Sequence, residues 1–380
     1  MSENLENRIN SEQAKDAIYK AHSMPSANKV DSVVLEERTL PTLFSSTLPY
    51  LKYIRLWKLS GINVYKTNIR AEKLFEDVFA DAIYYVSPTG NDTTGTGTKS
   101  NPFRSIIKAF YTEYTSAKRT IYIEAGTYVD DNGFASVNIP SSITHLNIIG
   151  LNGLVISERT SDISNLKLKP NCKFYMENIV FKGGNYPLQG NMTDNSYSEL
   201  YCKNCSFESA PSTSGFIWNG NGIIVMEKSI AKNNALDGFG YHTNITTDVL
   251  NRKLVVVEID CVGKNNGSIG NSNNASSTHD GVHSIRINGV YSDGNRPIHD
   301  IRGSKSIMLG CISKDGKDWG GNYVCGDNLG TDLSYMWLDG CSSSGLTSKS
   351  ILKWTQGEIY AYNFVSTANS LGYAPLPYEY

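Results

Sequence analysis

The chain has 380 residues, a formal net charge of −2 and a charged fraction of 19%. Proteins that bind nucleic acid concentrate basic residues on one surface, so this balance argues against a nucleic-acid partner. No stretch approaches the roughly 20 apolar residues of a membrane-spanning helix, and the first residues show neither the basic segment nor the apolar run of a secretory signal peptide.

The first 80 residues differ in pattern from the rest of the chain. Residues 12–21 predict a short helix, residues 51–65 alternate as a two-stranded hairpin, and residues 69–79 have helical spacing. We interpret residues 1–80 as a small α+β region for attachment or capping. One further domain is then expected over residues 81–380.

That domain opens with a strand at Ile83, a glycine-rich loop and the segment Asn101-Pro-Phe-Arg-Ser-Ile-Ile-Lys-Ala-Phe110. Apolar side chains recur there at positions i, i+4 and i+8, which predicts an amphipathic helix over 104–117. A strand from Thr120 to Glu124 follows and ends at Ala125-Gly-Thr-Tyr128. This order resembles the start of pectate-lyase-like β-helix proteins, in which the helix caps the open end of the first coil.

From residue 170 onward, short strands of alternating apolar residues recur, each followed by a polar step and Asn or Gly. Aligning them gives one equivalent position in each repeat: Ile179, Cys205, Ser229, Cys261, Val290, Cys311, Cys341 and Phe364. The intervals are 26, 24, 32, 29, 21, 30 and 23 residues. A period that tolerates insertions indicates a solenoid, because loops can vary in length while the strand ladder keeps its register.

The fold class predicted is therefore all-β, a right-handed single-stranded parallel β-helix with a small N-terminal α+β region. Four cysteines share the equivalent position, and we expect them to stack as small apolar side chains inside the tube. Cys202 and Cys205 form a CxxC, but no second such pair accompanies it, so a metal site is not expected there.

Four of the six histidines lie between residues 242 and 299, in three consecutive predicted coils. Their segments are Leu236-Asp-Gly-Phe-Gly-Tyr-His242, His279-Asp-Gly-Val-His283 and His299-Asp-Ile-Arg302. Each segment lies between two successive aligned positions of the repeat. We therefore expect Asp237, Asp280 and Asp300 in equivalent loops, as a row of carboxylates with neighbours about 5 Å apart.

Such a row suits glycoside hydrolysis, since carboxylate pairs about 5 to 5.5 Å apart fit a retaining enzyme and pairs about 6.5 to 9.5 Å apart an inverting one. The catalytic candidates are the three aspartates with His279, His283 and His299. The alternative is β-elimination on a uronic acid, with a histidine as base and Arg286, Arg302 or Lys305 stabilising the enolate. Calcium is the one cofactor considered for this site, because oxygen-rich loops bind calcium.

The candidates for substrate binding are His242, Tyr241, Tyr291, Arg302 and Lys305. The two tyrosines flank the loops and would offer sugar platforms, because an aromatic face combines an apolar surface with a polar edge. Trp354 is a further candidate platform. Each Asp-Gly or His-Asp pair taken alone is ordinary turn chemistry. Their repetition in consecutive coils is what favours a functional site.

From about Ile83 to Phe364 the chain resembles pectate-lyase-like β-helix proteins and, within them, bacteriophage tailspikes and capsule depolymerases. The resemblance implies a virion or extracellular protein that binds and degrades a bacterial surface polysaccharide, a homotrimer, and contacts with other tail proteins through residues 1–80. The adjacent Asp-Asp pair and Gly-His-Gly of polygalacturonase-type hydrolases are missing from the candidate loops. The alternatives are a non-catalytic receptor-binding tail protein and a bacterial uronan lyase or epimerase.

Overall fold

The computed structural model describes residues 71–112, 115–135, 137–191, 196–243, 254–268, 274–317, 321–326, 332–372 and 376–377. The helix expected at 12–21 and the hairpin expected at 51–65 lie outside these residues. The helix expected at 69–79 is wrong in its described part, where only the 3-10 turn η1 (Asp77–Phe79) forms. No helix in the described ranges is long and apolar enough to cross a membrane.

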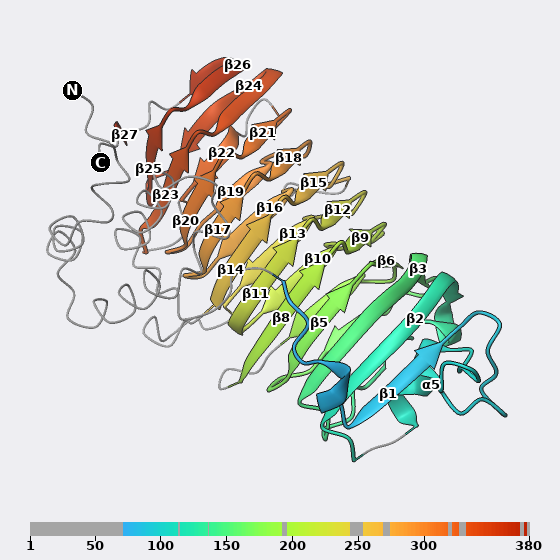
Figure 1. Ribbon diagram of the computed structural model, residues 1–380. Helices are drawn as coiled ribbons and strands as arrows, with labels where there is room; N and C mark the ends of the chain where they lie inside the picture. The colour runs from blue at the N-terminus through green and yellow to red at the C-terminus, as the bar shows by residue number, and fades with distance from the viewer. Residues whose placement is uncertain are drawn as a thin grey trace, which may run out of the picture.

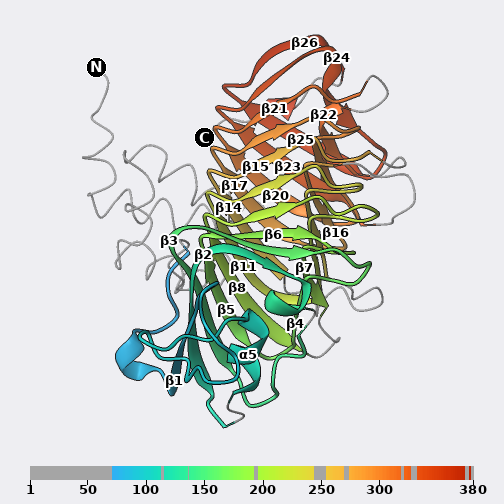
Figure 2. The same ribbon diagram turned by 90° about the vertical axis from the view of Figure 1, so that its right-hand side faces the viewer.

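The described chain winds into a tube of parallel strands, with three sheets along its length (Figure 1, Figure 2). The first sheet contains β1 (Ala82–Val86), β2 (Lys118–Val129), β3 (His145–Arg159), β5 (Lys173–Glu177), β8 (Tyr197–Lys203), β11 (Asn221–Glu227), β14 (Leu254–Ile259), β17 (His283–Ile287), β20 (Lys305–Leu309), β23 (Ser334–Asp339), β25 (Gly357–Tyr362) and β27 (Leu376–Pro377).

The second sheet continues from the later halves of β2 and β3 through β6 (Ile179–Gly183), β9 (Ser206–Glu208), β12 (Ile230–Lys232), β15 (Val262–Lys264), β18 (Val290–Ser292), β21 (Ile312–Lys314), the start of β24 (Ser342–Lys353) and β26 (Val365–Gly372). The third sheet contains β4 (Leu166–Leu168), β7 (Leu188–Asn191), β10 (Phe216–Asn219), β13 (Phe239–His242), β16 (Ser276–His279), β19 (Ile298–Asp300), β22 (Gly321–Cys325) and the end of β24. The parallel β-helix predicted from the repeat is confirmed.

A left-handed residue turns the chain from the first sheet into the second in successive coils. These residues have positive φ angles of 50° to 61°: Asn178, Asn204, Lys228, Asp260, Asn288, Gly310, Gly340 and Asn363. The position aligned in the sequence repeat corresponds to the residue directly after this turn. Seven of the eight aligned residues occupy that position. Val290 is wrong by one residue, because Gly289 follows the turn at Asn288.

The four aligned cysteines are buried and unpaired, as expected. Each thiol contacts a backbone carbonyl of the preceding coil: Cys205 that of Met176, Cys261 that of Met226, Cys311 that of Arg286 and Cys341 that of Met308, at 3.2–3.5 Å. Burial raises the pKa of Cys261 and Cys341 well above its usual value. At these four positions, small buried thiols therefore bridge adjacent coils.

The short helix α5 (Ile106–Tyr111) lies at the first coil. Ser105 caps it by accepting a hydrogen bond from the Lys108 amide, and the buried Arg119 guanidinium donates to the carbonyls of Ala109 and Phe110 at the helix end. The predicted span of 104–117 was too long. The strand predicted to end before Ala125 instead continues, after a register shift, to Val129.

The tube interior is apolar in its first coils and changes character in the middle. Phe134, Phe181 and Phe207 stack on one another inside the tube, with ring centroids 5.3 and 5.7 Å apart. Further on, Glu258 of β14 and Arg286 of β17 occupy adjacent positions in an interior row and are both fully buried.

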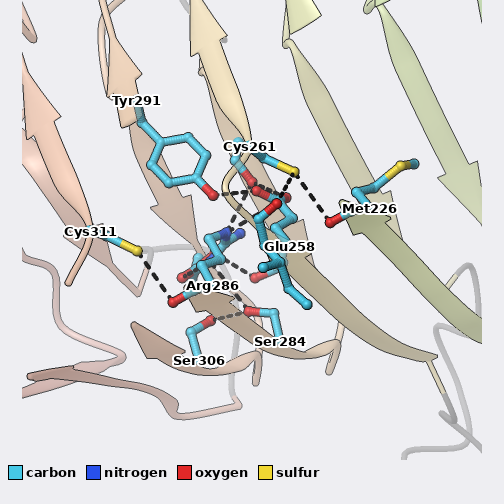
Figure 3. Close-up of polar contacts among 12 residues, drawn as sticks. Met226, Glu258, Cys261, Ser284, Arg286, Tyr291, Ser306 and Cys311 are labelled. Atoms are coloured by element: carbon cyan, nitrogen blue, oxygen red, sulfur yellow. Dashed lines mark hydrogen bonds and ion pairs between the residues drawn. The ribbon is translucent and has the colours of Figure 1, made fainter. Parts of the chain in front are cut away.

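The Arg286 guanidinium donates to both carboxylate oxygens of Asp300 at 3.1 Å and to the Ser276 hydroxyl at 3.0 Å. Glu258 accepts hydrogen bonds from Ser276 and from Tyr291, whose ring lies inside the tube (Figure 3). Burial alone lowers the pKa of Arg286, but the carboxylates of Asp300 and Glu258 outweigh it and raise that pKa. This arrangement is a closed ionic network, because each charge meets an opposite charge inside the tube.

Candidate functional site

Three histidines lie side by side on the outer face of the third sheet. His242 of β13 and His279 of β16 are direct register partners, and their ring centroids are 4.3 Å apart. His299 of β19 is register partner to Ser277, and its ring centroid is 5.8 Å from that of His279. Parallel register converts their recurrence along the chain into a short column of imidazoles.

The column continues into an arginine and a tryptophan. The ring centroids of His299 and Trp354 are 5.4 Å apart, and the Arg296 guanidinium lies 5.1 Å from the Trp354 ring centroid. Arg296 Nη1 is 3.2 Å from Nε2 of His299. His299 and Arg296 are buried, whereas Trp354 is partly exposed. They form a packed floor next to the more accessible His242 and His279.

Asp280 and Arg302 form the rim of this cluster. They occupy equivalent turn positions in adjacent coils, with φ angles of 64° and 54°, and each is followed by a glycine with positive φ. Asp280 Oδ2 is 3.7 Å from His242 Nδ1, and Asp280 Oδ1 is 3.6 Å from Arg302 Nη1. The exposed Arg302 therefore places a cation where the third sheet turns into the first.

Asp237 lies at the base of the cluster, immediately before β13. Its carboxylate accepts hydrogen bonds from the Asn274 amide at 2.9 Å, from the Asn274 side chain at 2.8 Å and from Ser277 Oγ at 3.0 Å. Burial raises the pKa of Asp237 despite these hydrogen bonds, which act in the opposite direction. Its oxygens are engaged within the protein, so its role in this geometry is to fix the loop before β16.

Burial makes neutral imidazoles of two members of the column. It lowers the pKa of His279 well below its usual value, and the neighbouring His242, His299 and arginines lower it further. The pKa of His299 is lowered in the same way by burial, then by Arg296 and Arg302. Among the described residues, His279 Nε2 is buried with no hydrogen-bond partner. Buried polar atoms without partners are costly, so they mark a place where a ligand would supply them.

The expected row of three equivalent carboxylates is wrong. The register partner of Asp300 is Thr278, whereas the turn position equivalent to Asp280 is Arg302. The two His-Asp pairs are therefore offset by two residues: His279 ends β16 and Asp280 follows in the turn, whereas His299 and Asp300 both belong to β19. Side chains alternate across a strand, so His299 points outward and Asp300 points into the tube.

Three predicted site residues lie in the interior. Asp300, Tyr241 and Tyr291 are fully buried within the tube, Asp300 against Arg286 and Tyr291 against Glu258. A polysaccharide outside the tube cannot reach them. Asp300 is therefore a structural partner of Arg286, and the two tyrosines are core residues rather than sugar platforms. Arg286 is removed from the enolate-stabilising candidates for the same reason.

His283 and Lys305 lie around the corner, on the first sheet. They are direct register partners at the starts of β17 and β20. Burial lowers the pKa of Lys305, and burial followed by Lys305 lowers the pKa of His283 to about 4. The turn of Asp280, Gly281 and Val282 separates them from the histidine column. The structure thus brings His242, His279, Asp280, His299 and Arg302 together, and leaves this pair apart.

Sequence reasoning missed Arg296 altogether. The available signal was a basic residue three positions before His299 in the same loop. Trp354 was foreseen only as a general sugar platform, since its place beside His299 depends on the stacking of β24 over β22 and β19. In the described ranges no group of three or more His, Cys, Asp or Glu side chains is arranged to hold a metal ion. Calcium binding stays a prediction.

A separate hollow of about 500 Å³ opens near the ends of β3 and β6, lined by residues 158–162, 182–184, 209 and 211–212. Its two cations already face carboxylates: Lys182 lies 2.9 Å from Glu158, and Arg159 lies 3.7 Å from Asp130. None of its described lining residues is aromatic. We therefore place the candidate site at the histidine cluster, where neighbouring imidazoles, cations and an aromatic ring converge.

The fold defines a parallel β-helix of the pectate-lyase-like type. A family model described as a protein of unknown function (DUF1565) matches residues 88–152, which include α5, all of β2 and the first half of β3. No curated protein matches the chain. Among solved structures, the chain is similar to pectate lyase Pel9A at 12% identity, with 77% of each chain covered and a TM-score of 0.51.

Two further solved structures are similar at lower TM-scores. The A-module of mannuronan C-5 epimerase AlgE4 from Azotobacter vinelandii has 13% identity over 68% of this chain and 90% of that chain, with a TM-score of 0.38. A rhamnogalacturonan lyase has 14% identity over 74% of each chain, with a TM-score of 0.28. At these sequence identities the structural similarity supports the fold alone, and the function has to be argued from the site.

Proposed function

We propose that this protein acts on an acidic polysaccharide by removing the ring proton next to a uronate carboxylate, followed by β-elimination of the glycosidic bond. The observation that carries the proposal is the column of His242, His279 and His299 flanked by Arg296 and Arg302. A neutral base beside a fixed cation is the pair of groups that this proton abstraction requires.

His279 is the proposed base. Its imidazole is neutral because burial and the neighbouring imidazoles and arginines lower its pKa, and its Nε2 has no hydrogen-bond partner among the described residues. The exposed Arg302 binds the substrate carboxylate and stabilises the negative charge that develops on it as the proton leaves. Asp280, which faces both Arg302 and His242, orients these two side chains.

The elimination balances with these groups. The ring C–H bond breaks, its proton passes to His279 and its electron pair forms a carbon–carbon double bond as the adjacent glycosidic C–O bond breaks. The leaving oxygen takes a proton from His242 or from water. Return of a proton to the opposite face of the same carbanion would instead give epimerisation. The geometry no longer favours hydrolysis through an aspartate row, because Asp300 is internal and the Asp237 carboxylate is engaged.

A non-catalytic sugar-binding role is the second candidate. The observation in its favour is the packing of His299, Arg296 and Trp354 against one another, which presents a fixed polar and aromatic surface. A phage tail protein with that surface as its receptor-binding part, assembled as a homotrimer and joined to other tail proteins through residues 1–80, is the corresponding biological setting that we propose. The sequence resemblance to tailspikes supports this setting.

The test is to incubate the purified full chain with capsular, lipopolysaccharide and plant or algal uronan glycans. New reducing ends and the ultraviolet absorbance of an unsaturated uronate are followed together. His279→Ala is expected to reduce turnover by about 10² to 10⁴-fold, the usual contribution of a positioned general base. His145→Ala, on the first sheet and outside the cluster, is the matched control and is expected to leave turnover unchanged.

Each outcome assigns one chemistry. Reducing ends with the absorbance mean elimination, and reducing ends alone mean hydrolysis and overturn the proposed base. A change in uronate composition without chain shortening means epimerisation. Saturable binding of a glycan with no turnover, lost in His279→Ala and Arg302→Ala but kept in His145→Ala, supports the receptor-binding candidate instead.

A further inference from the structure

The turns that lead from the second sheet into the third are closed by asparagines in two coils of the tube. One turn position, two residues after strand residues that are register partners, holds in successive coils Gly184, Ala210, Asn234 and Asn266. Asn234 and Asn266 are buried. Their side chains donate to the carbonyls of Phe207 and Ala231 in the preceding coils, at 3.1 and 3.0 Å. In these two coils the protein therefore fills the turn with its own amides.

The earlier turns leave space instead. The hollow of about 500 Å³ lies at the ends of β3, β6 and β9, which are neighbours in the second sheet (Figure 1). At Gly184 the stem of Arg159 takes the place of a side chain, since an added Cβ would lie 3.2 Å from Arg159 Cβ and 3.1 Å from its Cγ. The glycine thus admits an arginine of the preceding coil to the wall of the hollow.

Arg159 carries a charge that the protein matches only in part. Its side chain is 11% exposed, and its Nη1 is 3.7 Å from Asp130 Oδ1, which is longer than a hydrogen bond. The two oxygens of Asp130 already accept hydrogen bonds from the Thr160 amide and hydroxyl. Within the described ranges, Arg159 Nε is buried without a hydrogen-bond partner. A guanidinium offers a planar fork of donors, which matches the two oxygens of a carboxylate.

We propose that this hollow binds one acidic sugar residue through its carboxylate, as an anchoring site separate from the histidine cluster. The class of ligand rests on the proposed function, which takes an acidic polysaccharide as substrate. Arg159 pairs with the sugar carboxylate. Glu158, Asp162 and Ser212 line the same hollow and form hydrogen bonds with sugar hydroxyls. Small-molecule sites have volumes of about 300–1,000 Å³, and the hollow lies within that range.

The lining favours a sugar acid over a bare anion. Lys182 Nζ lies 2.9 Å from Glu158 Oε1, so these two charges largely neutralise each other. The remaining carboxylate of the lining, Asp162, repels a small free anion but accepts hydrogen bonds from hydroxyl groups. A ligand with one carboxylate and several hydroxyls therefore satisfies Arg159 and the acidic residues together.

The hollow is distinct from the histidine cluster. It precedes the strands of the third sheet, whereas His279 ends one of them. Along the tube, β7 and β16 are separated by three strand spacings, or about 14 Å at about 4.8 Å each. A polymer held at both places gains from two linked contacts, whereas a single sugar gains from only one. The site thus holds the polysaccharide without taking part in the chemistry.

The experiment measures binding by isothermal titration calorimetry to the full chain carrying Arg302→Ala, in which the histidine cluster lacks its exposed cation. The probes are galacturonate, glucuronate and mannuronate, with glucose as the neutral sugar and inorganic sulfate as the bare oxyanion. Arg159→Gln removes the guanidinium. Ser212→Trp, at an exposed lining position, fills the hollow and leaves Arg159 in place. Arg104→Gln, an exposed arginine before α5, is the matched control.

At least one uronate is expected to bind. Arg159→Gln and Ser212→Trp should each weaken that binding by about 10- to 100-fold, the usual effect of losing hydrogen bonds to a charged group. Arg104→Gln should leave it unchanged, and circular dichroism checks that every variant is folded. Glucose bound as well as the uronates, sulfate bound more tightly, or uronate binding unaffected by both hollow variants would each overturn the proposal.

Failure here and failure of the proposed function are read separately. Absence of uronate binding in the Arg302→Ala chain overturns the anchoring site, even where the intact chain degrades the polymer. Uronate binding that depends on Arg159, in a protein whose intact chain shows no turnover, keeps the anchoring site and overturns the proposed elimination alone.

Discussion

One interior row of side chains is apolar in the first coils of the tube and charged in the middle coils. In the first coils the row runs through Ile121, Ile148, Met176, Cys202 and Met226, and in the middle coils it becomes Glu258 and Arg286 before returning to Met308 and Leu338. The third-sheet strands of the two polar coils carry His279 and His299 outside, and His242 lies on the coil before them. In β19 a single strand carries an ion inside, Asp300, and an imidazole outside, His299.

The difference shows that register alone does not require an apolar interior. A buried ion pair costs desolvation and is retained where its geometry and its further hydrogen bonds offset that cost. Here Ser276, Thr278 and Tyr291 add those hydrogen bonds around Glu258 and Asp300. The network links β14, β16, β17, β18 and β19. Of these strands, β16 carries His279 and β19 carries His299, and Arg302 lies in the turn after β19.

The largest effect is expected when the ionic network is broken on one side. Arg286→Met leaves Glu258 and Asp300 buried without their cation, and the free energy of unfolding should fall by about 3–5 kcal/mol. Met308→Leu, one coil further along the same interior row, should cost less than about 1.5 kcal/mol. Urea denaturation measures both. Equal losses for the two variants would mean that the network is not a distinct structural unit.

Replacing the whole network sharpens the comparison. The triple variant Glu258→Met, Arg286→Met, Asp300→Leu makes the middle coils resemble the first ones. It should recover most of the stability lost in Arg286→Met, because no unpaired charge remains in the tube. Urea denaturation is again the measurement. A triple variant less stable than the single one would show that the shape of the interior, rather than its charge balance, decides the stability of these coils.

The next effect depends on pH and compares two histidines in one outward row of the first sheet. Burial and Lys305 lower the pKa of His283 from 6.5 to about 4, so folding favours the neutral imidazole. The resulting stability, about 3 kcal/mol at about 1.4 kcal/mol per pKa unit, is fully present above pH 6.5. It is lost as the pH falls from 6.5 towards 4.

His283→Gln should therefore flatten the fall in stability between pH 6.5 and 4, measured by denaturation at several pH values. His145→Gln is the matched control, because His145 lies in the same row on β3 and its pKa is also lowered by burial and nearby lysines, without reaching so low a value. The control should flatten the curve less. Identical curves for the two variants would contradict the assigned burial of His283.

The smallest effect concerns the left-handed turn shared by both regions. Gly340→Ala should lower the free energy of unfolding by about 1 kcal/mol, because a Cβ there meets nothing within 4 Å and only the backbone conformation is strained. Lys228→Asn, at the same turn in an earlier coil, should raise it by about 0.5 kcal/mol, since Asn tolerates this conformation better. Thermal unfolding compares them. The same sign for both changes would contradict a shared turn.

Much of the fold could be predicted from short-range signals. The recurrence of apolar strands with Asn or Gly after them marked the turn between the first and second sheets, and the aligned cysteines were placed correctly inside the tube. The capping helix was found from its spacing but overextended, because propensity does not show where tertiary contacts stop. The two carbonyls at the helix end accept hydrogen bonds from the buried Arg119, which belongs to a later strand.

The candidate site was less predictable. The sequence correctly pointed to the histidine-rich coils, yet it misaligned two similar His-Asp pairs. Which side of a strand a residue faces depends on where that strand begins, and a shift of one residue exchanges inside and outside. For that reason Asp300, next to the outward His299, became an interior ion, and Tyr241, next to the outward His242, became core.

The sequence by itself determined the solenoid, because a repeat of strands and turns is written in local patterns of apolar and small residues. The tertiary structure alone decided which polar side chains meet. Arg296 reaches His299 and Trp354, and Arg286 reaches Asp300, through strands stacked from separate coils. Such contacts depend on register between coils, which is set by the summed packing of the whole tube and leaves no local trace in the chain.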